Sequence, residues 1–484
     1  MKPYHSKHHY LILLGITILY GASASGQSIT QNYIRTRIPR TGISTAARLD
    51  QLTGVKDSVM TTVQYFDGLG RPIQTVQVYG SPTGRDLVQP IAYDSFGRES
   101  VKYLPYSATA ANSGGMYQSN VINDQASFYN NPSGTKWNAP GVVTILVNNG
   151  TTPSYAATAY EPSPLNRVIE QGAAGSAWQL SASGISGSGH TVKISYSANA
   201  ASEVTMWMIN SGGNGATGNT SYAAGTLDKT IATDENGNNS YEYKDLDGHV
   251  ICKTMQNGSV LLSTYYVYDD EGNLTYVIPP IPSTSNPQTT AYPASFLETD
   301  LAFLNYIYAY HYDSRNRVIQ KKIPGKGWEY FVYNKLDQAV LSQDAVQRNG
   351  NQWTVTKYDG EGRVIVTGLW NAGAAISQST LQASVYGSQQ WDNRDNANNL
   401  AANPTSYVIN SYPVVNTILS VNYYDDYSFA GVPLSFLTPA GTSSVSNRTK
   451  GLITATRTAV LNTVGNPSYN TSTKLDHLLS KTFV

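Results

Sequence analysis

The sequence predicts an all-β protein: an array of stacked β-hairpins that forms an open or partial shell, with a small β-sandwich-like domain inserted. Only 13% of the 484 residues are charged, against about 25% in an ordinary soluble domain, so residues that cover helix surfaces are scarce. The chain has 36 Tyr, and aromatic residues favour pleated, half-buried surfaces. A short turn pattern also recurs seven times, which indicates repeated supersecondary units.

These observations divide the chain into five regions. We expect a signal peptide over 1–26, an N-terminal β region with two repeat hairpins over 27–106, and an inserted β domain with Gly/Ser-rich loops over 107–232. The hairpin array follows over 233–370, and a degenerate repeat region with a surface excursion over 371–484.

The first 26 residues have the features of a secretory signal. Lys2 and Lys7 precede the apolar run Leu11 to Tyr20, and small residues fill 22–26. The run has half of the roughly 20 residues that a membrane span needs, although an uncleaved anchor is the alternative. We therefore expect export and no transmembrane span after cleavage. Cys252 is the only cysteine, and an exported chain without disulfides fits a bacterium better than a eukaryote.

The repeat consists of an aromatic residue, Asp, two variable residues, Gly and Arg. Asp or Asn holds the second place in all seven copies, and Gly, Asn or Asp holds the fifth. Unrelated hairpin turns are the alternative, but the flanking Tyr and Arg favour a true repeat. The defining residues are Asp67, Gly70 and Arg71; Asp94, Gly97 and Arg98; Asp245 and Gly248; Asp269 and Gly272; Asp313 and Asn316; Asn334 and Asp337; and Asp359, Gly362 and Arg363.

Local chemistry explains these residue types. Asp or Asn opening a type I turn accepts a hydrogen bond from the backbone that follows. The residue three places later must adopt a positive φ, which Gly does freely and Asn or Asp at a cost. Together these features predict a three-residue hairpin with a Gly bulge. We also expect the Arg after the Gly to lie over a Tyr ring of the neighbouring hairpin.

Other segments deviate from the repeat. Within 107–232 two strands are predicted, His190 to Ser197 and Glu203 to Asn210, and a helix-like run from Phe296 to Tyr306 interrupts the array. Tyr423-Tyr424-Asp425-Asp426 is interpreted as a degenerate copy of the repeat. Gln378 to Ala401 is rich in Gln and Asn and is predicted to form the surface excursion, with helix-like patches.

No catalytic residue, cofactor or metal site is predicted, and we do not expect an enzyme. Gly213 to Gly218 matches G-x-G-x-x-G, but no helix is expected after it to hold a phosphate. The acidic turns lack the spacing of an EF-type calcium loop. The formal charge of zero argues against nucleic acid as a partner. A carboxylate pair for glycoside hydrolysis is invisible in a sequence, and no feature singles one out.

The repeat resembles the tyrosine–aspartate (YD) repeat of the RHS family, large bacterial surface and toxin-delivery proteins. The match is close at Tyr93 to Arg98, Tyr268 to Leu274, Tyr312 to Val318 and Tyr358 to Val364. The arrangement resembles the N-terminal region of Bacteroidota members, in which an uncharacterised domain precedes the repeats. The resemblance implies a β-shell around a C-terminal polypeptide, often a toxin, and a Gram-negative cell exterior. The Asp-Pro core motif of RHS toxins is missing from this sequence.

Two functions follow as hypotheses. The first is a non-catalytic structural module of an exported RHS-like protein, with polypeptide cargo or further RHS repeats of a longer chain as partner. The alternative is a cell-surface carbohydrate-binding protein, in which Trp328, Trp353 and Trp370 would stack on glycans. Cross-strand packing of the same rings is the competing interpretation, and we favour it.

Overall fold

The computed structural model describes residues 31–40, 42, 45–52, 57–139, 153–185, 187–283, 291–395, 405–429, 449–459 and 475–476. The predicted signal peptide lies outside these residues. The described part is nearly all β, as predicted, with short helices between strands. None of its helices is long and apolar enough to cross a membrane. The chain divides into two compact units, residues 1–195 with 231–239, and residues 196–230 with 240–484.

The first unit is an antiparallel ladder in which β1, β2, β3, β4, β5, β7, β8 and β9 pair in that order. A short strand, β6, also pairs with β4. The strands are β1 (Asn32–Pro39), β2 (Val59–Phe66), β3 (Pro72–Gln77), β4 (Leu87–Ala92), β5 (Val101–Tyr103), β6 (Tyr106–Ser107), β7 (Tyr155–Tyr160), β8 (Val168–Gly172) and β9 (Val192–Ala198).

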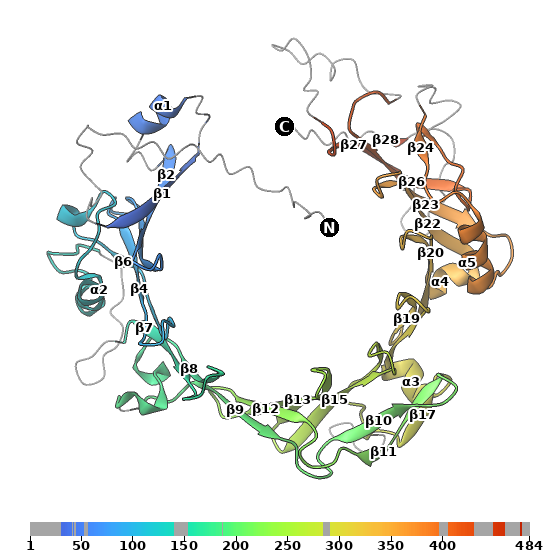
Figure 1. Cartoon of the computed structure of the whole chain (residues 1–484), viewed down its shortest axis with the longest axis horizontal. Coiled ribbons are helices and arrows are strands. Elements are labelled where there is room, and N and C mark those ends of the chain that lie inside the picture. The colour runs from blue at the N-terminus through green and yellow to red at the C-terminus, as the bar shows by residue number, and fades with distance from the viewer. Residues whose placement is uncertain are drawn as a thin grey trace. The chain divides into compact units, whose positions relative to one another are not determined.

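The core of the first unit lies between this ladder and helix α2 (Val121–Asn130). Burial alternates along β2, so every second side chain, including Val63 and Tyr65, faces inward. Trp137 packs edge-to-face against both Tyr106 and Phe128 of α2, and the Phe128 ring is tilted against Tyr106. Figure 1 shows α2 beside β4 and β6. Helix α1 (Ala46–Gln51) has no buried residue.

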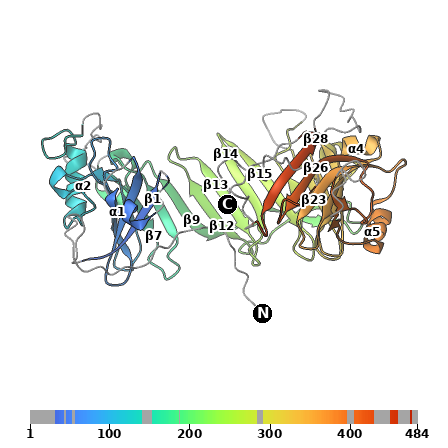
Figure 2. The same ribbon diagram turned by 90° about the horizontal axis from the view of Figure 1, so that it is seen from above.

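The second unit is built on a longer antiparallel meander. Each strand pairs with the next in the order β13 to β16, β18 to β23, and β26 to β28, and Figure 2 shows β13, β14 and β15 side by side. The strands are β13 (Asn239–Lys244), β14 (Val250–Asn257), β15 (Val260–Tyr268), β16 (Leu274–Ile278), β18 (Tyr308–Tyr312), β19 (Val318–Ile323), β20 (Gly327–Tyr333), β21 (Ala339–Gln343), β22 (Gln352–Tyr358), β23 (Val364–Asn371), β26 (Thr417–Tyr424), β27 (Ile453–Ala459) and β28 (Leu475–Asp476).

Smaller elements pack on this meander. A three-stranded sheet is formed by β10 (Thr205–Ile209), β11 (Gly215–Ser221) and β17 (Ser295–Leu297), and β24 (Asn393–Arg394) pairs with β25 (Tyr407–Val408). The helices are α3 (Leu301–Tyr306), α4 (Ala345–Asn349) and α5 (Gln378–Gly387). Figure 1 shows α4 and α5 close to β20 and β22.

The structure differs from the predicted insertion over 107–232. β7 and β8 continue the ladder of the first unit, whereas β10 and β11 pair with β17. The sequence did not reveal this because the Gly/Ser-rich loops obscure the alternation, and because β17 lies far along the chain. The strands predicted at 190–197 and 203–210 correspond to β9 and β10.

Two further segments refine the predictions. The helix-like run Phe296 to Tyr306 splits into the end of β17 and helix α3. Lys322 is fully buried beneath α3, and its ammonium donates to the carbonyl oxygens of Phe303, Leu304 and Ile307. It therefore caps the C-terminal end of α3, where carbonyl groups lack partners within the helix.

Candidate functional site: the coupled hairpin turns

The predicted turn geometry is confirmed in the repeat hairpins. At Asp67, the backbone N–H donates to Arg71 O at 2.9 Å, and Gly70 N–H donates to Asp67 O at 3.1 Å. The residue in the Gly place has a positive φ in every copy, 57° at Asn316 and 62° at Asp337. The strand pairing shifts by one residue beside these turns, as in β2–β3 and β22–β23, which is the predicted bulge.

The side chain that opens each turn holds the turn closed, through a carboxylate in six copies and through the amide of Asn334 in the seventh. One oxygen of Asp359 accepts from the backbone N–H groups of Glu361 and Arg363 at 3.1 and 2.9 Å, and the other accepts from Arg363 Nε at 2.7 Å. Asp67, Asp94 and Asp313 make the same set of contacts. At Asp94 the backbone N–H of Arg98, and then its side chain, lower the pKa of the carboxyl group.

The cation that ends a turn also contacts the next hairpin. The guanidinium carbon lies 4.3 to 4.6 Å from the centre of a Tyr ring in four steps, and the His249 ring lies 4.7 Å from that of Tyr268. The predicted Arg–Tyr contact is thus confirmed. The four pairs are Arg71–Tyr93, Arg98–Tyr160, Arg317–Tyr333 and Arg363–Tyr424.

A second contact runs in the opposite direction between six pairs of neighbouring hairpins. In each pair a Tyr hydroxyl donates to the carbonyl oxygen of the first residue after the preceding turn, for example Tyr333 Oη to Val318 O at 2.8 Å. Four of these Tyr rings also stack on the cation or His249 of that turn, whereas Tyr312 and Tyr358 make the hydroxyl bond alone. The sequence pattern did not predict this bond. The six examples are Tyr93 to Pro72, Tyr268 to Val250, Tyr312 to Leu274, Tyr333 to Val318, Tyr358 to Ala339 and Tyr424 to Val364. We call this set of turn-to-turn contacts the turn ladder.

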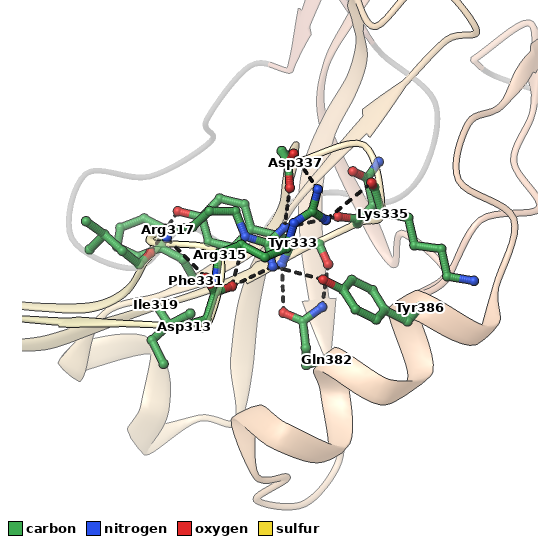
Figure 3. Close-up of polar contacts among 12 residues, drawn as sticks. Asp313, Arg315, Arg317, Ile319, Phe331, Tyr333, Lys335, Asp337, Gln382 and Tyr386 are labelled. Carbon is green, nitrogen blue, oxygen red and sulfur yellow. Dashed lines mark hydrogen bonds and ion pairs between the residues drawn. The ribbon is translucent and has the colours of Figure 1, made fainter. Parts of the chain in front are cut away.

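Arg317 forms the most extensive step of the turn ladder (Figure 3). Its Nε donates to Asp313 of its own turn at 2.8 Å, and its Nη1 donates to Asp337 of the next turn at 2.8 Å. Its Nη2 donates to the hydroxyl of Tyr386 on α5 at 2.9 Å. Arg315 adds a second ion pair to Asp337. One guanidinium therefore joins two hairpins and a helix.

Helix α5 uses two Gln side chains to bind strand edges. Gln382 accepts from Tyr333 N–H at 3.1 Å and donates to Tyr333 O, while Gln378 donates to Ile319 O and Phe331 O at 2.7 Å each. Figure 3 shows Gln382 and Tyr386 pointing from α5 toward Tyr333 and Arg317. The register of β19 and β20 would next pair Ile319 with Phe331. The Gln378 amide instead donates to the carbonyl oxygens of both residues, so it replaces strand-to-strand hydrogen bonds at this point.

One step of the turn ladder, at the β7–β8 turn, was not recognised from the sequence pattern. The β7–β8 turn uses Glu161, which binds Arg167 through both oxygens at 2.9 and 2.8 Å, and Asn166 supplies the positive φ. This turn is two residues longer, and the longer Glu side chain spans it. Hydrogen bonds from Arg167 lower the pKa of Glu161 to about 2. Two sequence features could have revealed this turn: Tyr160 stands directly before Glu161, and Val168 stands directly after Arg167.

The segment interpreted as a degenerate copy carries the last described step. Asp425 has a φ of 72° and binds Arg363 Nη1 and Nη2 at 3.0 and 2.8 Å. Its neighbour Tyr424 receives the Arg363 guanidinium on its ring. The hairpin coupling therefore continues beyond residue 371, although the Gly and Arg of the repeat are missing there.

The remaining candidate groups have structural contacts. Trp353 is buried and pairs across strands with Trp370, while Trp328 lies over His311 at 4.6 Å, which favours the cross-strand interpretation of these rings. In the described residues, one trio, Asp245, Asp247 and His249, has the proximity for a metal ion. The Asp245 carboxylate already accepts from Asp247 N–H and from both His249 N–H and Nδ1. Gly215 to Ser221, where a dinucleotide site would need its helix, form β11.

Replacing Gly248 by Ala is expected to destabilise the second unit by about 1–2 kcal/mol, since its φ is +87°. An added Cβ would meet nothing within 4 Å, so backbone conformation alone sets the cost. Gly248→Asn is the matched control and should cost less, because Asn316 already occupies this place in another turn. Urea unfolding of the three proteins measures the difference, and equal stability of Gly248→Ala and the parent would contradict the argument.

Replacing Gln382 by Leu is expected to cost about 1–3 kcal/mol, because it leaves the N–H and C=O of Tyr333 without their partner. Ser379→Ala, on the exposed side of the same helix, should change stability by less than about 0.5 kcal/mol. Thermal unfolding of both variants checks the contrast. Similar melting points for the two would show that α5 does not depend on this contact.

Comparison with known proteins gives a family match for part of the chain and a likeness to solved structures. Residues 35–192 match a domain of unknown function, DUF6443, and no curated protein matches the chain. Solved structures similar to this chain include the crystal structure of TcdB2-TccC3-TEV, with 12% identity and a TM-score of 0.37. Another is a mutant Photorhabdus luminescens Tc holotoxin pore, with 12% identity and a TM-score of 0.39. Each match covers 83% of this chain but only 17% of the other chain.

Proposed function

We propose that this chain is a non-catalytic structural module of an exported RHS-like protein. Its strands would form part of a β-shell that encloses or displays a C-terminal polypeptide such as a toxin. The observation that carries the proposal is the turn ladder, in which cation–ring contacts and Tyr hydroxyl bonds join successive hairpins, with both contacts present between Arg317 and Tyr333. The match of residues 35–192 to DUF6443 supports the resemblance to the uncharacterised domain ahead of the repeats.

The polar groups of the turn ladder are suited to holding a β-shell together and not to catalysing a reaction. Its carboxylates are occupied by backbone N–H groups and guanidinium groups, as at Asp359 and Asp313. A general acid or base needs a proton-transfer position facing a substrate, whereas these oxygens face their own turn. Each hairpin alone leaves a face uncovered, so coupling between neighbours is what stabilises an array of this kind.

The coupling itself is tested by a double-mutant cycle on Arg317 and Tyr333. Arg317→Gln and Tyr333→Leu together should reveal an interaction of about 0.5–2 kcal/mol. The control cycle pairs Arg317→Gln with Tyr358→Leu, a ring that belongs to the following step, and should be additive within about 0.5 kcal/mol. Additivity in both cycles would remove the energetic basis of the turn ladder.

Cargo enclosure is tested by limited proteolysis of the protein purified from its native host with all segments translated with it. We expect the part C-terminal to Val484 to resist digestion, and to become sensitive when Arg317→Gln and Arg363→Gln weaken the wall. Cleavage of that part at the rate of denatured protein, or its absence from the native product, would contradict the enclosure. Export is tested by sequencing the mature N-terminus, expected near Gln27, and by protease treatment of intact cells.

A further inference from the structure

A histidine on the meander has an oxygen atom opposite each of its ring nitrogens. Nδ1 of His311, on β18, lies 2.9 Å from Oε1 of Gln320, the residue paired with it on β19. Nε2 lies 2.7 Å from Oε1 of Glu298, in the segment between β17 and α3. A neutral imidazole carries only one N–H. The charge of the ring therefore depends on which end of the Gln320 amide faces it.

The orientation of the Gln320 amide follows from a neighbour on α5. The side-chain nitrogen of Gln378 lies 2.7 Å from the carbonyl oxygens of both Ile319 and Phe331. Because both of these groups are acceptors, that end of the Gln378 amide is its NH2 group, and its oxygen accepts from the NH2 group of Gln320 at 2.9 Å. The oxygen of the Gln320 amide is thus the end that faces His311 Nδ1, and this nitrogen must donate.

The second ring nitrogen faces a carboxylate. Glu298 Oε1 accepts from the Tyr276 hydroxyl at 2.8 Å and lies 2.7 Å from His311 Nε2. An imidazole is a stronger base than a carboxylate, so the proton of this second bond belongs to Nε2. Both nitrogens then donate, and the ring is an imidazolium. The Trp328 ring lies over it, with the ring centres 4.6 Å apart, and an aromatic face favours a cation.

The titratable groups around the ring agree with this assignment. Burial acts to lower the pKa of His311, but the hydrogen bond and the negative charge of Glu298 outweigh it and raise the pKa above the ordinary value of 6.5. Two further groups face Glu298. Burial lowers the pKa of Lys322, against the charge of Glu298, and its ammonium is bound to carbonyl oxygens of α3. Burial, and next Glu298, raise the pKa of Tyr276, so its hydroxyl stays a donor.

We propose that His311 is a proton-dependent clasp that holds the segment between β17 and α3 on the meander. In the protonated form it joins Glu298 of that segment to Gln320 and, through Gln378, to α5. A neutral ring has one N–H, so loss of the proton leaves either Glu298 or Gln320 without its donor. The segment is therefore held at low pH and loosens as the pH rises.

The direction of the pH dependence follows from the raised pKa of His311. A group whose folded pKa lies above its unfolded value binds its proton more tightly in the folded chain. The stability that it contributes is complete below about pH 6.5 and is lost as the pH rises through the folded pKa. This inference is independent of the proposed shell, because all of these contacts lie within the second unit and none belongs to the turn ladder.

The charge of the ring is measured by NMR on the full chain with 15N-labelled histidine. At pH 5.5 both nitrogens of His311 should have the chemical shifts of a protonated imidazolium, and the titration midpoint should lie above 6.5. Glu298→Gln should lower that midpoint. His190 of the first unit, which packs on Trp178, is the internal control and should titrate as in the parent. One unprotonated nitrogen at pH 5.5, or a midpoint at or below 6.5, would overturn the assignment.

The amide relay has its own test, because Gln378 reaches His311 through Gln320. Gln378→Leu leaves the Gln320 amide able to turn its NH2 group toward the ring, so the midpoint of His311 should fall. Gln382→Leu removes the other amide by which α5 binds strand edges. It is the matched control for loosening of α5 and should leave the midpoint unchanged. An unchanged midpoint in Gln378→Leu, or an equal fall in both variants, would overturn the relay.

Release of the segment is followed by hydrogen exchange at Glu298, whose N–H donates to Asn214 O at 3.0 Å. Its protection factor should fall by about tenfold between pH 6 and pH 8.5, relative to amides of β14 and β15 in the same core cluster. His311→Gln carries no titrating ring and should remove this pH dependence. Protection that does not change with pH in the parent, or that changes equally in His311→Gln, would overturn the clasp.

Discussion

Replacing Asp392 by Asn is expected to destabilise the second unit by about 3 kcal/mol at pH 7, because a buried ammonium loses its counter-charge. Asp392 and Lys357 are 0% and 1% exposed. Ser411 lies between them: Lys357 Nζ donates to Ser411 Oγ at 2.9 Å, and Ser411 Oγ donates to Asp392 at 2.5 Å. Asp392 also accepts from the N–H groups of Asn410 and Ser411. The bridge therefore ties the chain around residue 411 to β22.

The pH dependence of this loss identifies its cause. Burial lowers the pKa of Lys357 from 10.5 to about 8, against the opposing charge of Asp392. Because the unfolded chain holds this proton up to about pH 10.4, stability from this group rises between about pH 8 and pH 10. Without Asp392 the folded pKa falls further, so the gain begins at a lower pH. The difference between Asp392→Asn and the parent should shrink from pH 7 to pH 9.

Urea unfolding at the two pH values measures this difference. Asp247→Asn, an exposed carboxylate in the same unit, is the control and should change stability by less than about 0.5 kcal/mol at either pH. A loss in Asp392→Asn that is equal at pH 7 and pH 9 would show that packing, and not the charge of Lys357, accounts for it.

The turn geometry was predictable because its causes are contiguous in sequence. Asp94 binds backbone groups two and four residues ahead, so the residue types of one turn specify its conformation. The β7–β8 turn was missed because Glu161 and Arg167 stand six residues apart, whereas the repeat places its Asp and Arg four residues apart. The same local chemistry closes this turn, but its longer spacing differs from that of the repeat.

The sequence predicted the type of residue that each turn contacts, a Tyr ring, but not which Tyr it is. Arg317 stacks on Tyr333, 16 residues later (333 − 317), but Arg363 stacks on Tyr424, 61 residues later (424 − 363). Strand pairing decides which ring is adjacent, because β23 pairs with β26 across the intervening α5. The Lys357–Asp392 bridge and the Gln side chains of α5 depend on the same long-range docking, which no local pattern records.

Replacing Trp353 by Ala is expected to cost about 3–5 kcal/mol, the range for removing a fully buried aromatic side chain. Trp353 on β22 is 2% exposed and belongs to a cluster that joins Val332 and Leu341 of the meander to Leu381 and Val385 of α5. The cavity left behind would lie in the cluster that joins the helix to the sheet. We therefore expect α5 to loosen first, ahead of global unfolding.

Hydrogen exchange at Tyr333 distinguishes loosening of α5 from a uniform loss of stability. Its N–H donates to Gln382 of α5, so it should exchange faster in Trp353→Ala by a larger factor than amides of β14 and β15, which lie in a different core cluster. Trp391→Ala removes a ring that is 43% exposed and should leave both rates near those of the parent. If Trp353→Ala accelerated all these amides equally, α5 would be an integral part of the meander. The Gln contacts would then follow from sheet packing instead of holding the helix in place.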